Sequence, residues 1–394
     1  MQNKITQVNQ RNRTHHYANL IATNMRPKHL FVVFIILAIF VLWIYFSERS
    51  FLVYKFLVYT QNDAVYLDPF IVRPYWNEQQ MSRLPDLTRL AWPTVQSAIY
   101  PAGQRYKNGT VKPLPEVFKP VMSLAQRNLC KRMLNMISHV LFTNGFGNRF
   151  MLYGGTLLGS YRHHDFIPWD DDVDLVVDET IRTKLQQLLK SFEPDYQLVE
   201  QSKRDKFFTR MLNASSEEED LEFSRHSSEY SWGWPYIDIG YYQINDTHLC
   251  EIGESYGKQY CWPPSIVFPL RFRPLGPNWY PTPFDTLTFI RMTYTMDGKC
   301  VVFGYSHVLE GGGPSGSVEC SQLGADYAFV GRIGTNAKIY TWDESISTNE
   351  LIPIEESLIF SGVPFEGKRV VHSVRLPGLK HELLADMYGL FQYK

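Results

Sequence analysis

Hydrophobic and polar positions divide the chain into three stretches of different character. An uncharged run from Leu30 to Ser47 would extend about 27 Å as a helix at 1.5 Å per residue, enough to cross a thin bilayer. Residues 50–120 contain eight prolines and show poor hydrophobic periodicity, so no long helix is expected there. From residue 124 onward the pattern becomes that of a packed domain.

Apolar residues at helical spacing predict two helices in this domain, over 124–142 and 180–192. Three short apolar stretches predict strands, at 149–153, 175–177 and 234–241. Further on, residues 286–295 and 300–305 flank Met296-Asp297-Gly298-Lys299, a pattern typical of a β-hairpin, and 311–316 is glycine-rich and expected to be a flexible loop. The fold class predicted is α/β (α+β), a mixed sheet flanked by helices with a mainly β C-terminal extension.

Five carboxylates stand within nine residues directly before and after an apolar triplet: Asp170, Asp171, Asp172, Asp174 and Asp178. If residues 172–175 are extended, Asp172 and Asp174 share one face, about 7 Å apart at roughly 3.3 Å per residue. Carboxylates this close repel each other unless a cation lies between them. Oxygen ligands with open positions suit Mg²⁺ or Mn²⁺ bridging to substrate phosphates. The alternative is a solvated acidic loop, which the apolar residues on both sides of the cluster disfavour.

Upstream of the cluster, Leu158-Gly159-Ser160 is predicted to begin a helix whose free amides face a phosphate. Eleven residues separate Ser160 from Asp172. The order of these segments is that of a phosphate cradle followed by a metal-binding strand.

The segment as a whole resembles the signature of the LicD and fukutin family of phosphotransferases. The resemblance is carried by Gly155-Thr156-Leu157-Leu158-Gly159, by Arg162, and by Phe166-Ile167-Pro168-Trp169 followed by Asp170-Asp171-Asp172-Val173-Asp174. It implies a nucleotidyltransferase-like fold and transfer of a phosphorylated alditol, choline or similar group from a CDP-activated donor to a glycan. The donor class follows from the resemblance and not from spacing.

The resemblance also implies which side chains form the site. Asp172 and Asp174 would hold the cation, and Arg162 could clamp phosphate oxygens. Gly155, Thr156, Gly159 and Ser160 would contact the donor. Asp238, placed between Ile237 and Ile239 on a predicted strand, would complete the metal site or accept a proton, since an acid there is costly to bury without a partner. The alternative is an edge-strand carboxylate that faces water.

Charge and flanking residues bear on location and partners. The net charge of −1 over 394 residues gives no reason to expect nucleic-acid binding. Five cations and no acid precede residue 30, so the run 30–47 is read as a type II signal anchor with a lumenal region after residue 48, in the Golgi or ER. A cleaved signal peptide is the alternative, although no Ala-x-Ala-like site follows. The sequons at Asn108, Asn213 and Asn245 agree with a lumenal location.

Five cysteines, Cys130, Cys250, Cys261, Cys300 and Cys320, allow two disulfides and one free thiol in an oxidising compartment. Cys250 and Cys261 are the favoured pair because they are close in sequence. A zinc site is the alternative, since some members of the family carry a zinc loop, but the spacing fits no common ligand pattern.

The expected domain organisation is a cytosolic tail (1–29), an anchor (30–47), a stem (48–123), a LicD/nucleotidyltransferase-like catalytic domain (124–283) and a mainly β C-terminal region (284–394). Two other functions stay open. An Asp-x-Asp glycosyltransferase would also combine a type II anchor with a metal-binding acid pair, but does not require Asp238 or the upstream Gly-Ser. A catalytically silent lumenal binding protein would not require the acid cluster at all.

Overall fold

A computed structural model describes residues 36–39, 42–43, 67–212, 219–255, 257–337, 351–363 and 367–390. Most of the predicted anchor therefore lies outside the described residues, as does the sequon at Asn213. Among the residues that are described, no helix is both long enough and apolar enough to span a bilayer. Residues 67 onward belong to one compact unit.

A mixed sheet forms the centre of this unit, with the strand order β1-β2-β5-β4-β3. Its strands are β1 (Phe150–Leu152), β2 (Asp174–Asp178), β5 (Ile237–Ile244), β4 (Arg204–Thr209) and β3 (Tyr196–Glu200). Strands β2 and β5 are parallel and the other pairs in this order are antiparallel. All five residues of β2 are buried, which explains why its sequence is a continuous apolar run between two acids. The predicted mixed α+β class is confirmed.

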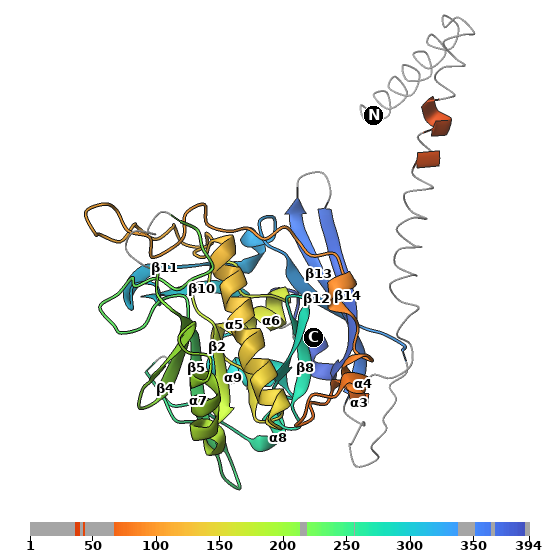
Figure 1. Cartoon of the computed structure of the whole chain (residues 1–394). Helices are drawn as coiled ribbons and strands as arrows, with labels where there is room; N and C mark the ends of the chain where they lie inside the picture. Colours follow the sequence, from red (N-terminus) through yellow and green to blue (C-terminus); the bar gives the residue numbers. More distant parts are fainter. Residues whose placement is uncertain are drawn as a thin grey trace, which may run out of the picture. The chain divides into compact units, whose positions relative to one another are not determined.

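Helices cover the sheet. The longest, α5 (Leu124–Thr143), begins with a capping box between Ser123 and Gln126 and lies beside β2 in the view of Figure 1. The others of eight residues or more are α6 (Gly154–His163), α7 (Arg182–Lys190) and α9 (Thr286–Thr293), and the short helices are α3 (Leu67–Phe70), α4 (Glu78–Met81) and α8 (Pro264–Val267). The apolar positions that predicted α5 are buried, except Leu124 at its first turn.

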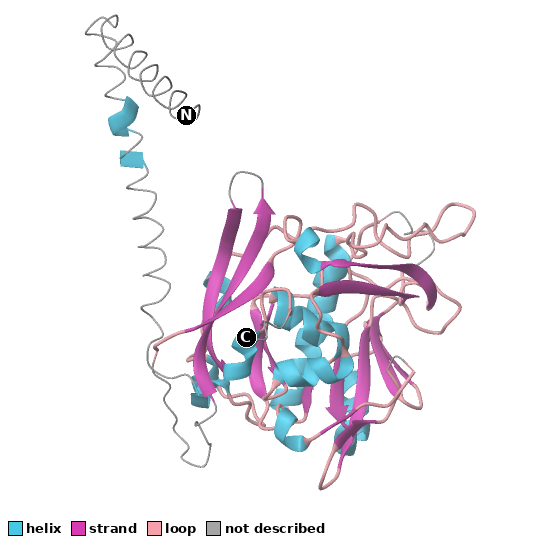
Figure 2. Cartoon of the chain, turned by 180° about the vertical axis from the view of Figure 1, so that it is seen from behind, coloured by secondary structure: helices cyan, strands magenta, loops and turns pink. Residues whose placement is uncertain are grey.

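Further strands complete the unit. Two short strands, β6 (Leu249–Glu251) and β7 (Cys261–Trp262), extend the central sheet from β5, and β8 (Arg271–Leu275) pairs with β9 (Asn278–Thr282). The hairpin β10 (Lys299–Ser306) and β11 (Gly311–Glu319) and the sheet of β12 (Phe329–Gly334), β13 (Leu351–Val363) and β14 (Gly367–Leu379) follow. In Figure 2 this hairpin and this sheet lie on opposite sides of the unit.

The disulfide Cys250–Cys261 links β6 to β7, and the disulfide Cys300–Cys320 closes the β10–β11 hairpin. Cys130 is a buried free thiol. The predicted pairing of Cys250 with Cys261 is confirmed. The four cysteines considered for zinc are all used in these bonds.

Three sequence predictions differ from the structure. Residues 286–293 form helix α9 instead of a strand, because Asp285 caps the first turn and Leu287, Phe289 and Ile290 are buried at helical spacing. The glycine-rich segment 311–316 is part of β11 and not a loop, since β10 supplies its backbone partners. The described residues of the expected stem, from 67 to 123, contribute buried side chains to the main core, among them Phe70, Leu87 and Phe118.

Candidate active site

The start of helix α6 lies against two carboxylates of the acid cluster. A Cβ atom on Gly154 would stand 2.3 Å from Asp174 Oδ2, and one on Gly155 would stand 2.3 Å from Asp170 Oδ2. The two glycines therefore allow an approach that any side chain would block. Thr156 Oγ1 accepts a hydrogen bond of 2.8 Å from the Asp174 amide, which ties this turn to β2. The positive end of the helix dipole faces the carboxylates.

The predicted helix start at Leu158-Gly159-Ser160 is wrong, because α6 begins at Gly154. A Cβ atom on Gly159 would lie 2.6 Å from the Asp165 carbonyl oxygen, so this glycine allows close packing between the helix and the following loop. Ser160 is fully buried and its Oγ donates to the Pro274 carbonyl at 2.7 Å. Both residues stabilise the position of the helix, and neither is among the residues that line the cleft beside the acid cluster. Of the four predicted donor-contacting residues, Gly155 and Thr156 lie in the first turn.

Parallel pairing of β2 and β5 places Asp174 and Asp238 opposite each other in register. Strand β4 supplies two cations to this pair of carboxylates. Arg204 Nη1 lies 3.8 Å from Asp174 Oδ1 and 3.6 Å from Asp238 Oδ2. Lys206 Nζ lies 3.7 Å from Asp238 Oδ2. The other oxygen of Asp238, Oδ1, is buried without a hydrogen-bond partner among the described residues. The structure thus brings the predicted carboxylates together and leaves one of their oxygens available.

Charge compensation in the cluster is incomplete. Burial raises the pKa of Asp170 well above its usual range, and the neighbouring Asp172 and Asp171 raise it further. The pKa of Asp174 is also raised well above its usual range by burial and by Asp172 and Asp238, despite the nearby Arg204. Repulsion of this kind is relieved when a cation binds between the carboxylates.

His307, which the sequence analysis did not assign to the site, contacts the acid cluster from the connection between β10 and β11. Its Nδ1 lies 3.0 Å from Asp171 Oδ1 and its Nε2 lies 3.4 Å from Asp172 Oδ2. Burial would lower the pKa of His307, but Asp172 and Asp171 together raise it well above its usual value. The three residues can bring one ligand atom each to within 4.8 Å of one another. No local sequence signal marks His307, because the contact joins segments 136 residues apart.

Arg162 is a buried cation without an ionic partner in the described part of the chain. It is 7% exposed, its Nε has no hydrogen-bond partner, and its Nη2 lies 3.4 Å from the Met296 sulfur. Burial lowers the pKa of Arg162 to about 10. Because it borders the same cleft as the acid cluster, it is placed to bind an anion there.

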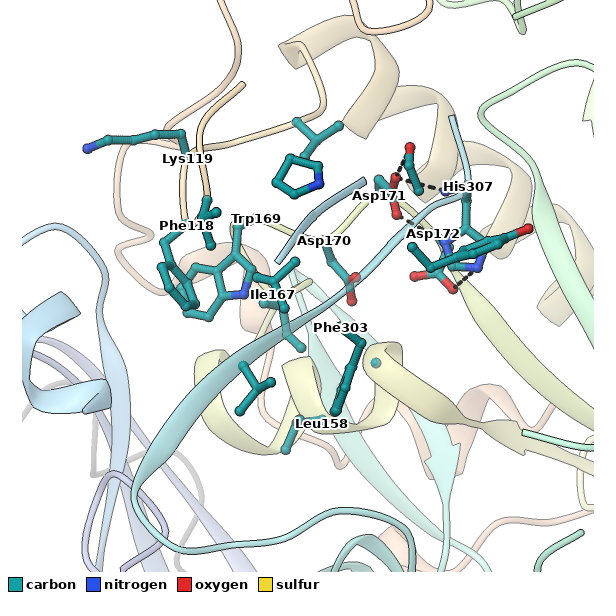
Figure 3. A pocket seen from close by; sticks show the side chains of 18 of the residues that line it. Phe118, Lys119, Leu158, Ile167, Trp169, Asp170, Asp171, Asp172, Phe303 and His307 are labelled. Atoms are coloured by element: carbon teal, nitrogen blue, oxygen red, sulfur yellow. Dashed lines mark hydrogen bonds and ion pairs between the residues drawn. The ribbon is translucent and has the colours of Figure 1, made fainter. Parts of the chain in front are cut away.

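The cleft has a volume of about 370 Å³ and two chemically distinct ends. In Figure 3, Asp171, Asp172 and His307 gather on one side, Phe118, Ile167 and Trp169 on the other, and Asp170 lies between them in this view. Asp174 and Arg162 also line the cleft, whereas Asp238 is not among its lining residues. The arrangement places the acid cluster beside an apolar surface, with the guanidinium of Arg162 bordering the same cleft.

Residues 147–285 match the family model described as LicD/FKTN/FKRP, nucleotidyltransferase domain. The matched range contains Arg162, the acid cluster and Asp238, and ends before His307. No curated protein matches the chain.

Proposed function

The chain belongs to the LicD/FKTN/FKRP family through its nucleotidyltransferase domain at residues 147–285, and we propose that it is a cation-dependent phosphotransferase. It moves a phosphorylated alditol, choline or similar group from a CDP-activated donor to a glycan. The observation that carries this proposal is that Asp170 and Asp174, whose charges are incompletely compensated, share a cleft with Asp172 and with Arg162, which has no ionic partner among the described residues.

The residues present fit a divalent cation. The raised pKa values of Asp170 and Asp174 and the unpartnered Oδ1 of Asp238 all indicate missing positive charge. Asp172 and Asp174 would hold Mg²⁺ or Mn²⁺, with Asp238 beside them. Such an ion, when bound, neutralises the donor diphosphate and the charge that develops on the leaving nucleotide.

The chain's own groups orient the reactants. Arg162 binds phosphate oxygens, and the amides at the start of α6 add partial positive charge. Arg204 forms ion pairs with the carboxylates of Asp174 and Asp238, and Lys206 forms one with Asp238, so these cations fix the positions of both carboxylates. Asp238, expected as a proton acceptor, is held by these two cations and is therefore assigned a supporting role.

In the reaction, the oxygen of an acceptor hydroxyl forms a bond to the phosphorus that carries the transferred group. The bond between that phosphorus and the oxygen of CMP breaks, and CMP leaves with the bonding electrons. The hydroxyl proton passes to a carboxylate of the cleft, and we assign this step to Asp170 because its side chain borders the cleft between the two ends.

We also propose a lumenal setting in the Golgi or ER with a single N-terminal anchor. The disulfides Cys250–Cys261 and Cys300–Cys320 support it, because such bonds persist in oxidising compartments. Asn108 and Asn245 are exposed and accessible to glycosylation. Glycosidase treatment of the expressed protein should increase its mobility, and an unglycosylated chain digested by protease added outside sealed microsomes would overturn this location.

The released nucleotide tests the reaction. The full chain in detergent is incubated with Mg²⁺ or Mn²⁺, a panel of CDP-alditols and CDP-choline, and glycan acceptors. Acceptor-dependent CMP is the expected product. Acceptor-dependent UDP, GDP or CDP instead would identify a glycosyltransferase, and no turnover over a broad donor panel would favour the silent binding protein.

A further inference from the structure

We infer that His307 is a cation ligand through its Nε2 atom, supplied to the acid cluster by the β10–β11 hairpin, and that the site therefore prefers Mn²⁺ to Mg²⁺. The inference rests on the proposed cation-dependent centre and specifies its ligands. The hairpin lies outside the matched range 147–285, so this ligand is an addition to the domain.

Asp171 positions the imidazole ring of His307. Its Oδ2 accepts hydrogen bonds from Ser306 Oγ at 3.1 Å, from the His307 amide at 3.0 Å and from the Val308 amide at 3.4 Å. Its Oδ1 lies 3.0 Å from His307 Nδ1. Both oxygens of Asp171 are thereby occupied in fixing the hairpin connection and the ring, which leaves cation binding to the other carboxylates.

This contact determines which ring nitrogen is free. When Nδ1–H donates to Asp171, Nε2 carries the lone pair, and it points to Asp172. A histidine that donates one ring N–H to a carboxylate and presents the other nitrogen is the usual arrangement of a metal-bound imidazole.

The 3.4 Å distance between His307 Nε2 and Asp172 Oδ2 supports a shared ion. It exceeds the usual 2.7–3.2 Å range for an N–H···O hydrogen bond. Two ligand atoms at about 2.1–2.2 Å from one ion, at an angle somewhat above 90°, are separated by about 3.0–3.5 Å. The simpler alternative is an imidazolium that forms ion pairs with Asp171 and Asp172 and binds no metal.

A second cluster holds the other end of the hairpin connection. Glu310 accepts hydrogen bonds from Trp232 Nε1 at 2.8 Å, from Tyr236 Oη at 2.6 Å and from Tyr305 Oη at 2.9 Å. Lys206, which also contacts Asp238, lies 3.8 Å from Glu310 Oε1. The hairpin is therefore fixed to the central sheet on both sides of His307, as a ligand position requires.

An independent observation points to a ligand in the same centre. Asp238 is 6% exposed, faces Asp174 across the β2–β5 pair, and keeps Oδ1 unpartnered among the described residues. A buried carboxylate oxygen without a donor is costly unless a cation satisfies it.

An imidazole nitrogen changes the selectivity of an oxygen site. Mg²⁺ prefers oxygen ligands and loses water reluctantly, whereas later first-row ions accept nitrogen readily and Mn²⁺ accepts both. Removing His307 should therefore weaken Mn²⁺ binding more than Mg²⁺ binding.

The test uses the full chain, stripped of metal and titrated with Mn²⁺ without donor or acceptor. Pulsed electron paramagnetic resonance should detect one strongly coupled ¹⁴N nucleus on the bound ion, and histidine labelled with ¹⁵N should replace that signal with a ¹⁵N coupling. His307→Gln should abolish the coupling and weaken Mn²⁺ binding at least about tenfold, with a smaller change for Mg²⁺. His248→Gln, at an exposed histidine, is the matched control and should change neither.

Bound Mn²⁺ without nitrogen coupling in the unmodified chain, or coupling that persists in a folded His307→Gln variant, would overturn the inference. The labelling experiment needs no variant, so an absence of nitrogen coupling overturns the inference even if His307→Gln misfolds. Nitrogen coupling without CMP release would preserve this inference and overturn the proposed function, and CMP release without nitrogen coupling would do the reverse.

Discussion

Two buried charge clusters in this protein have opposite electrostatics. At Glu356, which is fully buried, Arg273 Nη2 and Arg332 Nε lie 2.7 Å and 2.9 Å from the carboxylate and His164 Nε2 lies 2.8 Å away. Burial raises the pKa of Glu356, but Arg273 and Arg332 outweigh it and hold the pKa well below its usual range. In the acid cluster, burial and like charges raise the pKa values of Asp170 and Asp174.

We interpret the Glu356 cluster as structural and the acid cluster as the proposed cation site. The Glu356 cluster joins β8, β12 and β13 to the end of α6, and side chains of the protein compensate the charge of its carboxylate. The acid cluster borders a cleft, and the cations near it do not offset the repulsion among its carboxylates, so we expect it to gain stability when a cation binds. Perturbed carboxylates in a cleft are the usual sign of a functional site.

The largest effect is expected where the complete cluster is broken. Glu356→Gln keeps the shape of the side chain but leaves Arg273 and Arg332 buried without a counter-charge. The free energy of unfolding should fall by about 3–5 kcal/mol, measured by urea denaturation. A loss below about 1 kcal/mol would contradict the view that this cluster stabilises the fold.

In the acid cluster, Asp174→Asn should spare the fold and impair the reaction. The substitution removes a repelled charge, so stability should stay constant or rise, while the rate of CMP release should fall at least 100-fold, about 3 kcal/mol in barrier. Asp178→Asn, at the other end of β2, is the matched control because Asp178 pairs with Arg149 at 2.8 Å. Near-normal turnover by folded Asp174→Asn would rule out its assignment to the cation site.

Arg162→Gln should weaken the reaction less. The guanidinium has no ionic partner among the described residues, so its loss should not reduce the unfolding temperature. Loss of one phosphate contact should slow CMP release about 10- to 100-fold, or about 1.4–2.7 kcal/mol. A marked loss of stability with unchanged turnover would show that Arg162 is structural.

The smallest effect belongs to a partly exposed pair, His381 and Asp285, at 2.9 Å. The hydrogen bond between the two side chains raises the pKa of His381. Burial raises the pKa of Asp285, but hydrogen bonds from His381 and Thr288 outweigh burial and lower this pKa overall. The raised His381 pKa adds stability below about pH 6.5 that is lost as pH rises through the folded pKa. The lowered Asp285 pKa adds stability above about pH 4 that is lost on acidification.

His381→Ala should therefore lower stability by less than about 1 kcal/mol, and by more at pH 5.5 than at pH 8.5. Thermal unfolding of both proteins at the two pH values measures the difference. An equal loss at both values would show that the pair's ionisation does not contribute.

Local patterns predicted the parts of the site that depend on neighbours in sequence. The apolar run after Asp174, the apolar neighbours of Asp238 and the short spacing of Cys250 and Cys261 each express a local rule. Long-range partners left no such signal. Glu356 meets His164 across 192 residues, and His307 reaches Asp171 only after the hairpin has folded. The true start of α6 at Gly154 also left no local signal, because Gly154 and Gly155 are required by carboxylates that approach from Asp170 and Asp174.

Cation-dependent stabilisation tests the proposed difference between the two clusters most directly. The thermal unfolding of the full chain is followed as Mg²⁺ or Mn²⁺ is added to the wild-type protein and to Asp172→Asn/Asp174→Asn. Wild type should gain about 2.7 kcal/mol at a cation concentration 100 times the dissociation constant, and the double variant should gain little. No cation-dependent shift in the wild type, or an equal shift in both proteins, would contradict the assignment of the acid cluster as a cation site.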